Sequence, residues 1–126
     1  MILELNEYVR TKNGIISKVI GVQSGGIEKY FFDKEVIDNF KELTQIGAEN
    51  VVAKHSFNII DLIEVGDYVN GSRVIEVNKD KETGYVSVEY SIRDKDEIML
   101  ALLYDEDSIK SIVTKEQFKT MEYEVK

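Results

Sequence analysis

Two Asn-Gly dipeptides constrain the fold of this chain more than any other feature of its sequence. Asn13-Gly14 and Asn70-Gly71 each lie between runs rich in β-branched residues. Asparagine and glycine both tolerate the positive φ angles that a two-residue type I′ hairpin turn requires. Each dipeptide therefore predicts an antiparallel hairpin.

The residues around the two dipeptides also recur along the chain. Tyr8-Val9 and Val19-Ile20 are echoed by Tyr68-Val69 and Val74-Ile75, about sixty residues later. Such self-similarity indicates two related strand–turn–strand units, at about residues 5–32 and 65–92. A chance likeness between two valine-flanked hairpins is the alternative. The run over residues 65–77 also looks like the opening strands of SH3-like small barrels.

Further strands are predicted from aromatic, β-branched and alternating segments. Residues 85–92 alternate, with Val86 and Val88 facing the same side, whereas residues 98–104 are apolar on both faces, which favours a central strand over a buried helical turn. The remaining predicted strands cover residues 27–32, 51–54, 109–113 and 123–125.

One main helix is predicted over residues 34–46. Asp33 is a suitable N-cap and Gly47 a suitable end, and five apolar residues share one face at three- and four-residue spacing: Val36, Ile37, Phe40, Leu43 and Ile46. Short helical turns are predicted at 57–63 and at 115–121, the second opening with a capping box at Thr114 and Gln117.

Together these elements predict a single α+β domain over residues 1–126. It is β-rich, with a curved antiparallel sheet or an SH3-like small barrel, one main covering helix at about 34–46 and short helical turns. The length of 126 residues suits one hydrophobic core.

Composition excludes several classes of protein. The chain has no cysteine, which removes disulfides, thiol catalysis and cysteine-ligated metals. No window approaches the roughly 20 apolar residues of a membrane span, and the first residues lack the basic start and apolar run of a signal peptide. We therefore expect a cytoplasmic protein that does not interact with membranes.

No catalytic residue, metal ligand or cofactor site is predicted. His55 is the only histidine and has no motif around it, so a structural role is expected. Asp94, Asp96 and Asp105 have the spacing of a calcium loop, but Ile98 and Met99 stand where an oxygen ligand and a glycine are needed. The Ser24-Gly-Gly stretch lacks the lysine of a phosphate-binding loop. An enzyme is therefore the least expected class.

The net charge of −8 argues against direct binding to nucleic acid, which requires clustered lysine and arginine. Six acidic residues flank the apolar segment 98–104: Asp94, Asp96, Glu97, Asp105, Glu106 and Asp107. Such a group can imitate the phosphates of a nucleic acid and occupy a basic cleft of a partner protein. Two solvated turns on either side of a buried strand are the alternative.

The segments IIDLIEVGDYVNG (residues 59–71) and IKSIVTKEQF (residues 109–118) resemble segments of small phage and prophage proteins of Gram-positive bacteria. The opening residues 7–16 are similar to the start of these proteins as well. The resemblance implies a phage or mobile-element setting and carries over no functional residue.

The leading hypothesis is a non-enzymatic phage accessory protein that binds a basic protein through its acidic surface, for example to inhibit a nucleic-acid-directed host defence such as a CRISPR nuclease. A second hypothesis is a protein that sequesters a nucleotide signal, which would require convergence of four cations: Arg10, Lys12, Arg73 and Arg93. A third is a structural or assembly module, whose sign would be a long unpaired strand edge or an exposed apolar patch. The sequence leaves the oligomeric state open.

Overall fold

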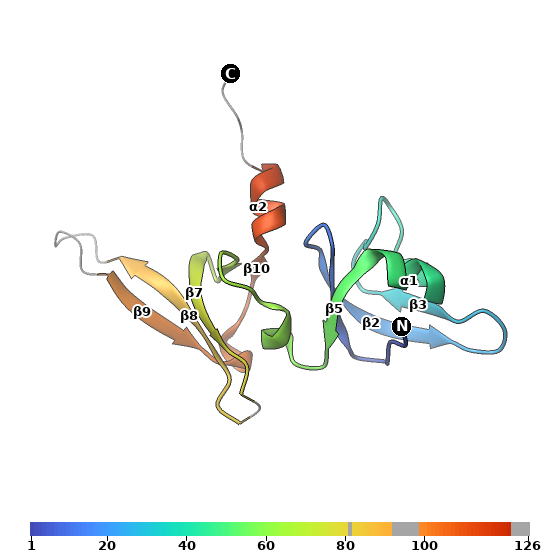
Figure 1. Ribbon diagram of the computed structural model, residues 1–126, viewed down its shortest axis with the longest axis horizontal. Coiled ribbons are helices and arrows are strands. Elements are labelled where there is room, and N and C mark those ends of the chain that lie inside the picture. The colour runs from blue at the N-terminus through green and yellow to red at the C-terminus, as the bar shows by residue number, and fades with distance from the viewer. Residues whose placement is uncertain (81, 92–98, 122–126) are drawn as a thin grey trace, which may run out of the picture. The chain divides into compact units, whose positions relative to one another are not determined.

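The computed structural model describes residues 1–80, 82–91 and 99–121 (Figure 1). The chain forms two compact units, Met1–Leu62 and Ile63–Lys126. The single domain and the two related segments at 5–32 and 65–92 stay predictions, and each of these segments falls in a different unit.

The first unit contains a five-stranded antiparallel sheet in the order β4-β3-β2-β1-β5. Its elements are β1 (Tyr8–Thr11), β2 (Ile16–Gln23), β3 (Lys29–Phe32), β4 (Glu42–Thr44), α1 (Gln45–Val51), β5 (Val52–Ser56) and the 3-10 helix η1 (Ile59–Leu62).

The second unit also contains a five-stranded antiparallel sheet, in the order β10-β6-β7-β8-β9. Its elements are β6 (Tyr68–Val69), β7 (Ser72–Asn78), β8 (Tyr85–Ser91), β9 (Met99–Tyr104), the 3-10 helix η2 (Glu106–Ser108), β10 (Ile112–Val113) and α2 (Lys115–Met121). The predicted α+β, β-rich antiparallel class is thus confirmed, and one of the sheets curls into a half-barrel.

The two units share one connectivity. In each, four strands follow one another as neighbours, a short helix comes next, and the fifth strand pairs with the first. The turns that lead into β1 and β6 also match, because Asn6 and Gly66 both have positive φ angles, of 71° and 96°. The register shifts after Val19 in β2 and after Val74 in β7, so a β-bulge stands at the same place in both sheets.

The buried residues are the inward-facing positions of the strands. In the first unit the core includes Val9, Val19, Tyr30, Phe32 and Leu43. The Tyr30 hydroxyl accepts a hydrogen bond from the Leu3 amide at 3.2 Å and donates one to Glu28 Oε2 at 3.0 Å, and burial raises its pKa. In the second unit Val69, Val74, Val86 and Val88 are fully buried, but Ser87 between the last two is buried as well, so burial along β8 does not alternate as predicted for residues 85–92.

The predicted helix over 34–46 is wrong. Residues 34–41 form turns around a bridge between Ile37 and Phe40, and the helix begins only at Gln45, capped by the hydroxyl of Thr44. The Asp33 carboxylate, predicted to cap the helix, instead accepts hydrogen bonds from the Ser17 hydroxyl and the Lys18 amide of β2.

Residues 42–44 form a strand and not part of a helix because they pair, as β4, with the edge of β3. Leu43 pairs with Tyr30 across this edge and is buried. Of the five apolar residues of the predicted helical face, only Val36 and Leu43 are buried, whereas Phe40 and Ile46 are 58% and 71% exposed. The backbone hydrogen bonds of a sheet therefore outweigh the local helical pattern.

The other predicted elements were located with small differences. Both Asn-Gly hairpins form, but only Asn70 and Gly71 both have positive φ angles, whereas in the first hairpin only Gly14 does. The strand predicted over 98–104 is present as β9, yet it lies at an edge of its sheet, not at the centre. The predicted strand 123–125 lies outside the described residues. In the described part of the chain, no helix has the length and apolar character needed to cross a membrane.

Candidate functional site

Three of the predicted acidic residues are held in a fixed turn at the end of β9. Asp105 caps η2, because its Oδ1 accepts hydrogen bonds from the Ser108 amide at 2.9 Å and the Ser108 hydroxyl at 2.7 Å. These bonds, the hydroxyl first, lower the pKa of Asp105. Asp105, Glu106 and Asp107 are all exposed. Their charges are therefore presented to solvent on a defined backbone.

The turn between β7 and β8 adds two more acids at the same end of this sheet. Asp80 Oδ1 accepts hydrogen bonds from the Glu82 amide at 2.8 Å and the Thr83 amide at 3.2 Å, which lower the pKa of Asp80. Asn78 at the end of β7 pairs with Tyr85 at the start of β8, and Val86 pairs with Tyr104 at the end of β9. The β7–β8 turn and the start of η2 therefore lie at the same end of the sheet (Figure 1).

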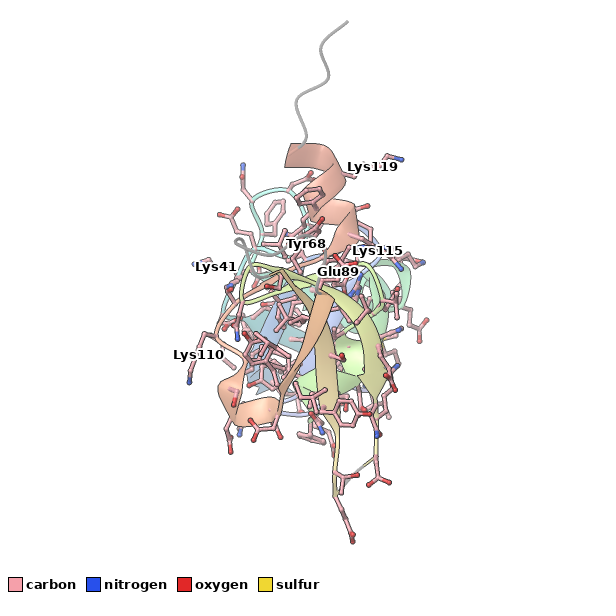
Figure 2. The ribbon with its side chains drawn as sticks, turned by 90° about the vertical axis from the view of Figure 1, so that its left-hand side faces the viewer. Lys41, Tyr68, Glu89, Lys110, Lys115 and Lys119 are labelled. Carbon is pink, nitrogen blue, oxygen red and sulfur yellow. The ribbon has the colours of Figure 1, made fainter. Side chains whose placement is uncertain are left out.

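We call this group the acidic end: Asp80, Glu82, Asp105, Glu106 and Asp107. None of the ion pairs among the described residues involves it. Lys110 lies nearby and points away from the strands, and its ammonium donates to the main-chain carbonyl of Asp107 at 3.1 Å (Figure 2). The five carboxylates are thus not paired with a described cation.

Asp80 and Glu82 were not among the predicted acidic residues, because they lie far along the chain from residues 94–107. The pairing of residues 85–92 with 98–104 was the signal that could have found them. Asp94, Asp96 and Glu97 lie outside the described residues. In the sequence they precede β9, whereas Asp105 follows it. A six-residue strand is about 17 Å long, so the two groups of acids belong to opposite ends of β9 in the sequence. Their membership of one surface with 105–107 stays a prediction.

The acidic charge is concentrated in the unit that carries the acidic end. Residues 63–126 contain fifteen acidic and nine basic side chains, a net charge of −6, whereas residues 1–62 contain nine and seven, a net charge of −2. The field of the second unit therefore reinforces the local charge of the acidic end.

Of the four cations predicted to hold a nucleotide, Arg10 and Arg73 contact other groups of the protein. Arg10 is 1% exposed and its Nη1 donates to the Leu62 carbonyl at 2.9 Å. Arg73 Nη1 contacts Glu89 Oε1 at 3.2 Å. Lys12 lines a hollow of about 210 Å³ beside Val36 and Ile37, and Arg93 lies outside the described residues.

A second hollow, of about 310 Å³, lies over β3 and β4. Phe31 and Phe40 form its apolar part and three polar residues complete it: Asn39, Lys41 and Glu42. It is open to solvent, and each of its polar side chains is exposed. It offers a shallow apolar surface without converging polar groups.

His55 has the structural role that the sequence predicts. Its Nδ1 lies 2.5 Å from Glu7 Oε1, and the other carboxylate oxygen of the buried Glu7 accepts a hydrogen bond from the Glu4 amide at 3.0 Å. This contact joins β5 to the turn before β1. Among the described residues, no group of three or more histidine, aspartate or glutamate side chains is placed to hold a metal ion.

Comparison of the chain with protein-family models, with curated proteins and with solved structures found no match.

Proposed function

We propose that this chain is a non-enzymatic binding protein that engages a basic partner protein through the acidic end. The observation that carries the proposal is the gathering, at one end of the second sheet, of five exposed carboxylates that form no ion pair with a described cation. Hydrogen bonds to their own turns fix two of them. Charge of one sign on a rigid surface raises association rates and selects partners of opposite charge.

The setting that we propose is a phage or prophage protein in the cytoplasm of its bacterial host. Support comes from the resemblance of residues 59–71 and 109–118 to phage proteins and from the acidic composition. The partner would be a host defence protein that acts on nucleic acid, with the carboxylates occupying the place of phosphates. The chain itself would not bind nucleic acid directly.

The test compares two triple variants in capture from host lysate followed by titration with the purified partner. The first, Glu82→Gln, Glu106→Gln and Asp107→Asn, removes three exposed charges of the acidic end without touching the capping residues Asp80 and Asp105. We expect binding at least about tenfold weaker, and an affinity that falls as salt screens the contact.

The matched control removes three exposed acids of the first unit by Glu4→Gln, Glu35→Gln and Glu42→Gln. It changes the net charge equally and should leave the affinity nearly unchanged. Equal weakening by both triple variants, or an affinity indifferent to salt, would exclude the acidic end as the binding surface. If the acidic end does bind the partner, duplex DNA should displace the chain from that partner, and this competition tests whether the carboxylates occupy the place of phosphates.

A further inference from the structure

Among the described residues, no strand pairs with the outer edge of β9. In the described part of the second unit, β9 is the last strand of the sheet and pairs only with β8 (Figure 1). The β8–β9 ladder runs through six consecutive residue pairs, from Val86–Tyr104 to Ser91–Met99, without a register shift. Because alternate amides of an antiparallel strand point to opposite sides, β9 presents a regular row of donors and acceptors away from β8.

The other three sheet edges are shortened or interrupted. In the first unit β4 has three residues, and β5 contains Lys54 and pairs with β1 through a register shift at Arg10/Thr11. In the second unit the opposite edge, β10, has two residues. Short strands, lysines and bulges are the usual means by which proteins block strand addition. β9 has none of them.

The composition of β9 also suits an added strand. Its sequence, MLALLY, has no charge, no proline and no glycine. Leu103 is 62% exposed and Leu102 is 37% exposed, although both lie in a regular ladder. A partner strand along this edge would cover apolar surface and complete backbone hydrogen bonds at once.

Charge decides which strand fits. Asp105, Glu106 and Asp107 directly follow β9, and Asp94, Asp96 and Glu97 come within five residues before it in the sequence. Antiparallel pairing with a second copy would bring the acids after one β9 toward the acids before the other, and parallel pairing would set identical groups side by side. Like charges on neighbouring strands destabilise their pairing.

We propose that β9 accepts an extended segment of the basic partner protein as an added strand, with an apolar centre of about six residues and lysine or arginine at its ends. This inference rests on the proposed function and gives its mode of binding. The backbone of β9 supplies affinity, and the acids that follow it select a basic segment over a second copy of the chain.

The experiment uses the full chain and synthetic ten-residue peptides, each with an alternating valine and threonine centre. One peptide carries two lysines at each end, a second carries glutamates instead, and a third is the lysine peptide N-methylated at alternate residues. Titration calorimetry should detect binding of the lysine peptide, with the glutamate and N-methylated peptides each at least about tenfold weaker. NMR should show slower exchange of β9 amides when the lysine peptide is bound.

Two variants separate strand addition from charge attraction alone. Leu103→Asp places a charge on β9, and Ile75→Asp places the same charge on β7, which is an inner strand of the sheet. Both residues are exposed, so folding should tolerate either change. Strand addition predicts weaker binding of the lysine peptide to L103D only, whereas charge attraction alone predicts slightly tighter binding to both.

Several outcomes would overturn the strand-addition mode while leaving the proposed function intact: no binding of the lysine peptide, equal binding of the N-methylated peptide, or tighter binding to L103D. Sedimentation of the free chain as a dimer that L103D dissociates would also overturn it, in favour of pairing between two copies. The proposed function fails separately, if the triple variant of the acidic end still binds the captured partner normally.

Discussion

Replacement of Asp67 by alanine should destabilise the second unit more than any surface change. Asp67 is fully buried, and its carboxylate connects two segments that are far apart in sequence. Oδ2 accepts a hydrogen bond from the Glu64 amide at 2.7 Å, and Oδ1 accepts one from the Lys115 amide at 2.9 Å. The side chain thus closes the turn before β6 and holds the first residue of α2.

The magnitude follows from these two amides. A buried donor left without an acceptor costs about 1–3 kcal/mol. Both hydrogen bonds are partly buried, so each amide contributes a cost in the lower part of this range. We therefore expect a net loss of about 2–3 kcal/mol for Asp67→Ala, or a fall in Tm of roughly 10 °C.

The assay is urea unfolding of the full chain followed by circular dichroism, with Asp67→Asn as the companion variant. The asparagine retains one acceptor oxygen in nearly the same shape, so its cost should be about half that of alanine. A loss below about 1 kcal/mol for Asp67→Ala, or equal losses for both variants, would refute the view that the two amide bonds carry the stability.

Asn70→Ala should lower the unfolding free energy by about 2 kcal/mol in the same assay, because Asn70 has a φ of 51° and its Oδ1 accepts hydrogen bonds from the Lys110 and Ser111 amides. A loss below about 0.5 kcal/mol would contradict this role. Gly84→Ala should cost about 1–3 kcal/mol, since its Cβ would lie 2.7 Å from the Asp80 carbonyl oxygen, and a neutral result would show that the turn shifts freely. In a carbon-detected NMR titration the carboxyl of Asp105 should titrate below the usual value of about 3.9, because hydrogen bonds from Ser108 favour its charged form. Its contribution to stability is present above the unfolded pKa and is lost as the pH falls through the lower folded pKa, so a midpoint at or above the usual value would contradict the cap.

Local sequence predicted the elements whose signals are short in range. The Asn70-Gly71 turn, the strand that buries Val86 and Val88, and the cap of α2 by Thr114 each depend on residues within a few positions of one another. The helical turns at η1 and α2 were located for the same reason. These interactions form largely without regard to the rest of the chain.

The helix predicted over 34–46 failed because its signal competed with a distant partner. The pattern of Val36, Leu43 and Ile46 fits a helix as well as the periodicity rule requires. Residues 29–32 form β3, and pairing with β4 gives the backbone groups along its edge hydrogen-bond partners. A helix over residues 34–46 would leave those groups without partners in the sheet. No pattern within residues 34–46 reports the existence of that edge.

The candidate site divides in the same way. The acids at 105–107 were evident from the sequence, and so was the apolar character of residues 98–104. Their place on one surface depends on strand order, because pairing of β7, β8 and β9 sets Asp80 and Glu82 at the same end of the sheet as Asp105 and leaves β9 at an edge.

The sequence by itself determined that this chain builds antiparallel hairpins with an acidic surface, since turn conformations and side-chain charge are properties of residues and their near neighbours. Only the tertiary structure decided that two units repeat one connectivity, and that the apolar strand β9 lies at the edge of the described sheet and not in its middle. The physical reason is that hydrogen bonds between strands join residues far apart in sequence, and the backbone groups that make them are the same in every residue.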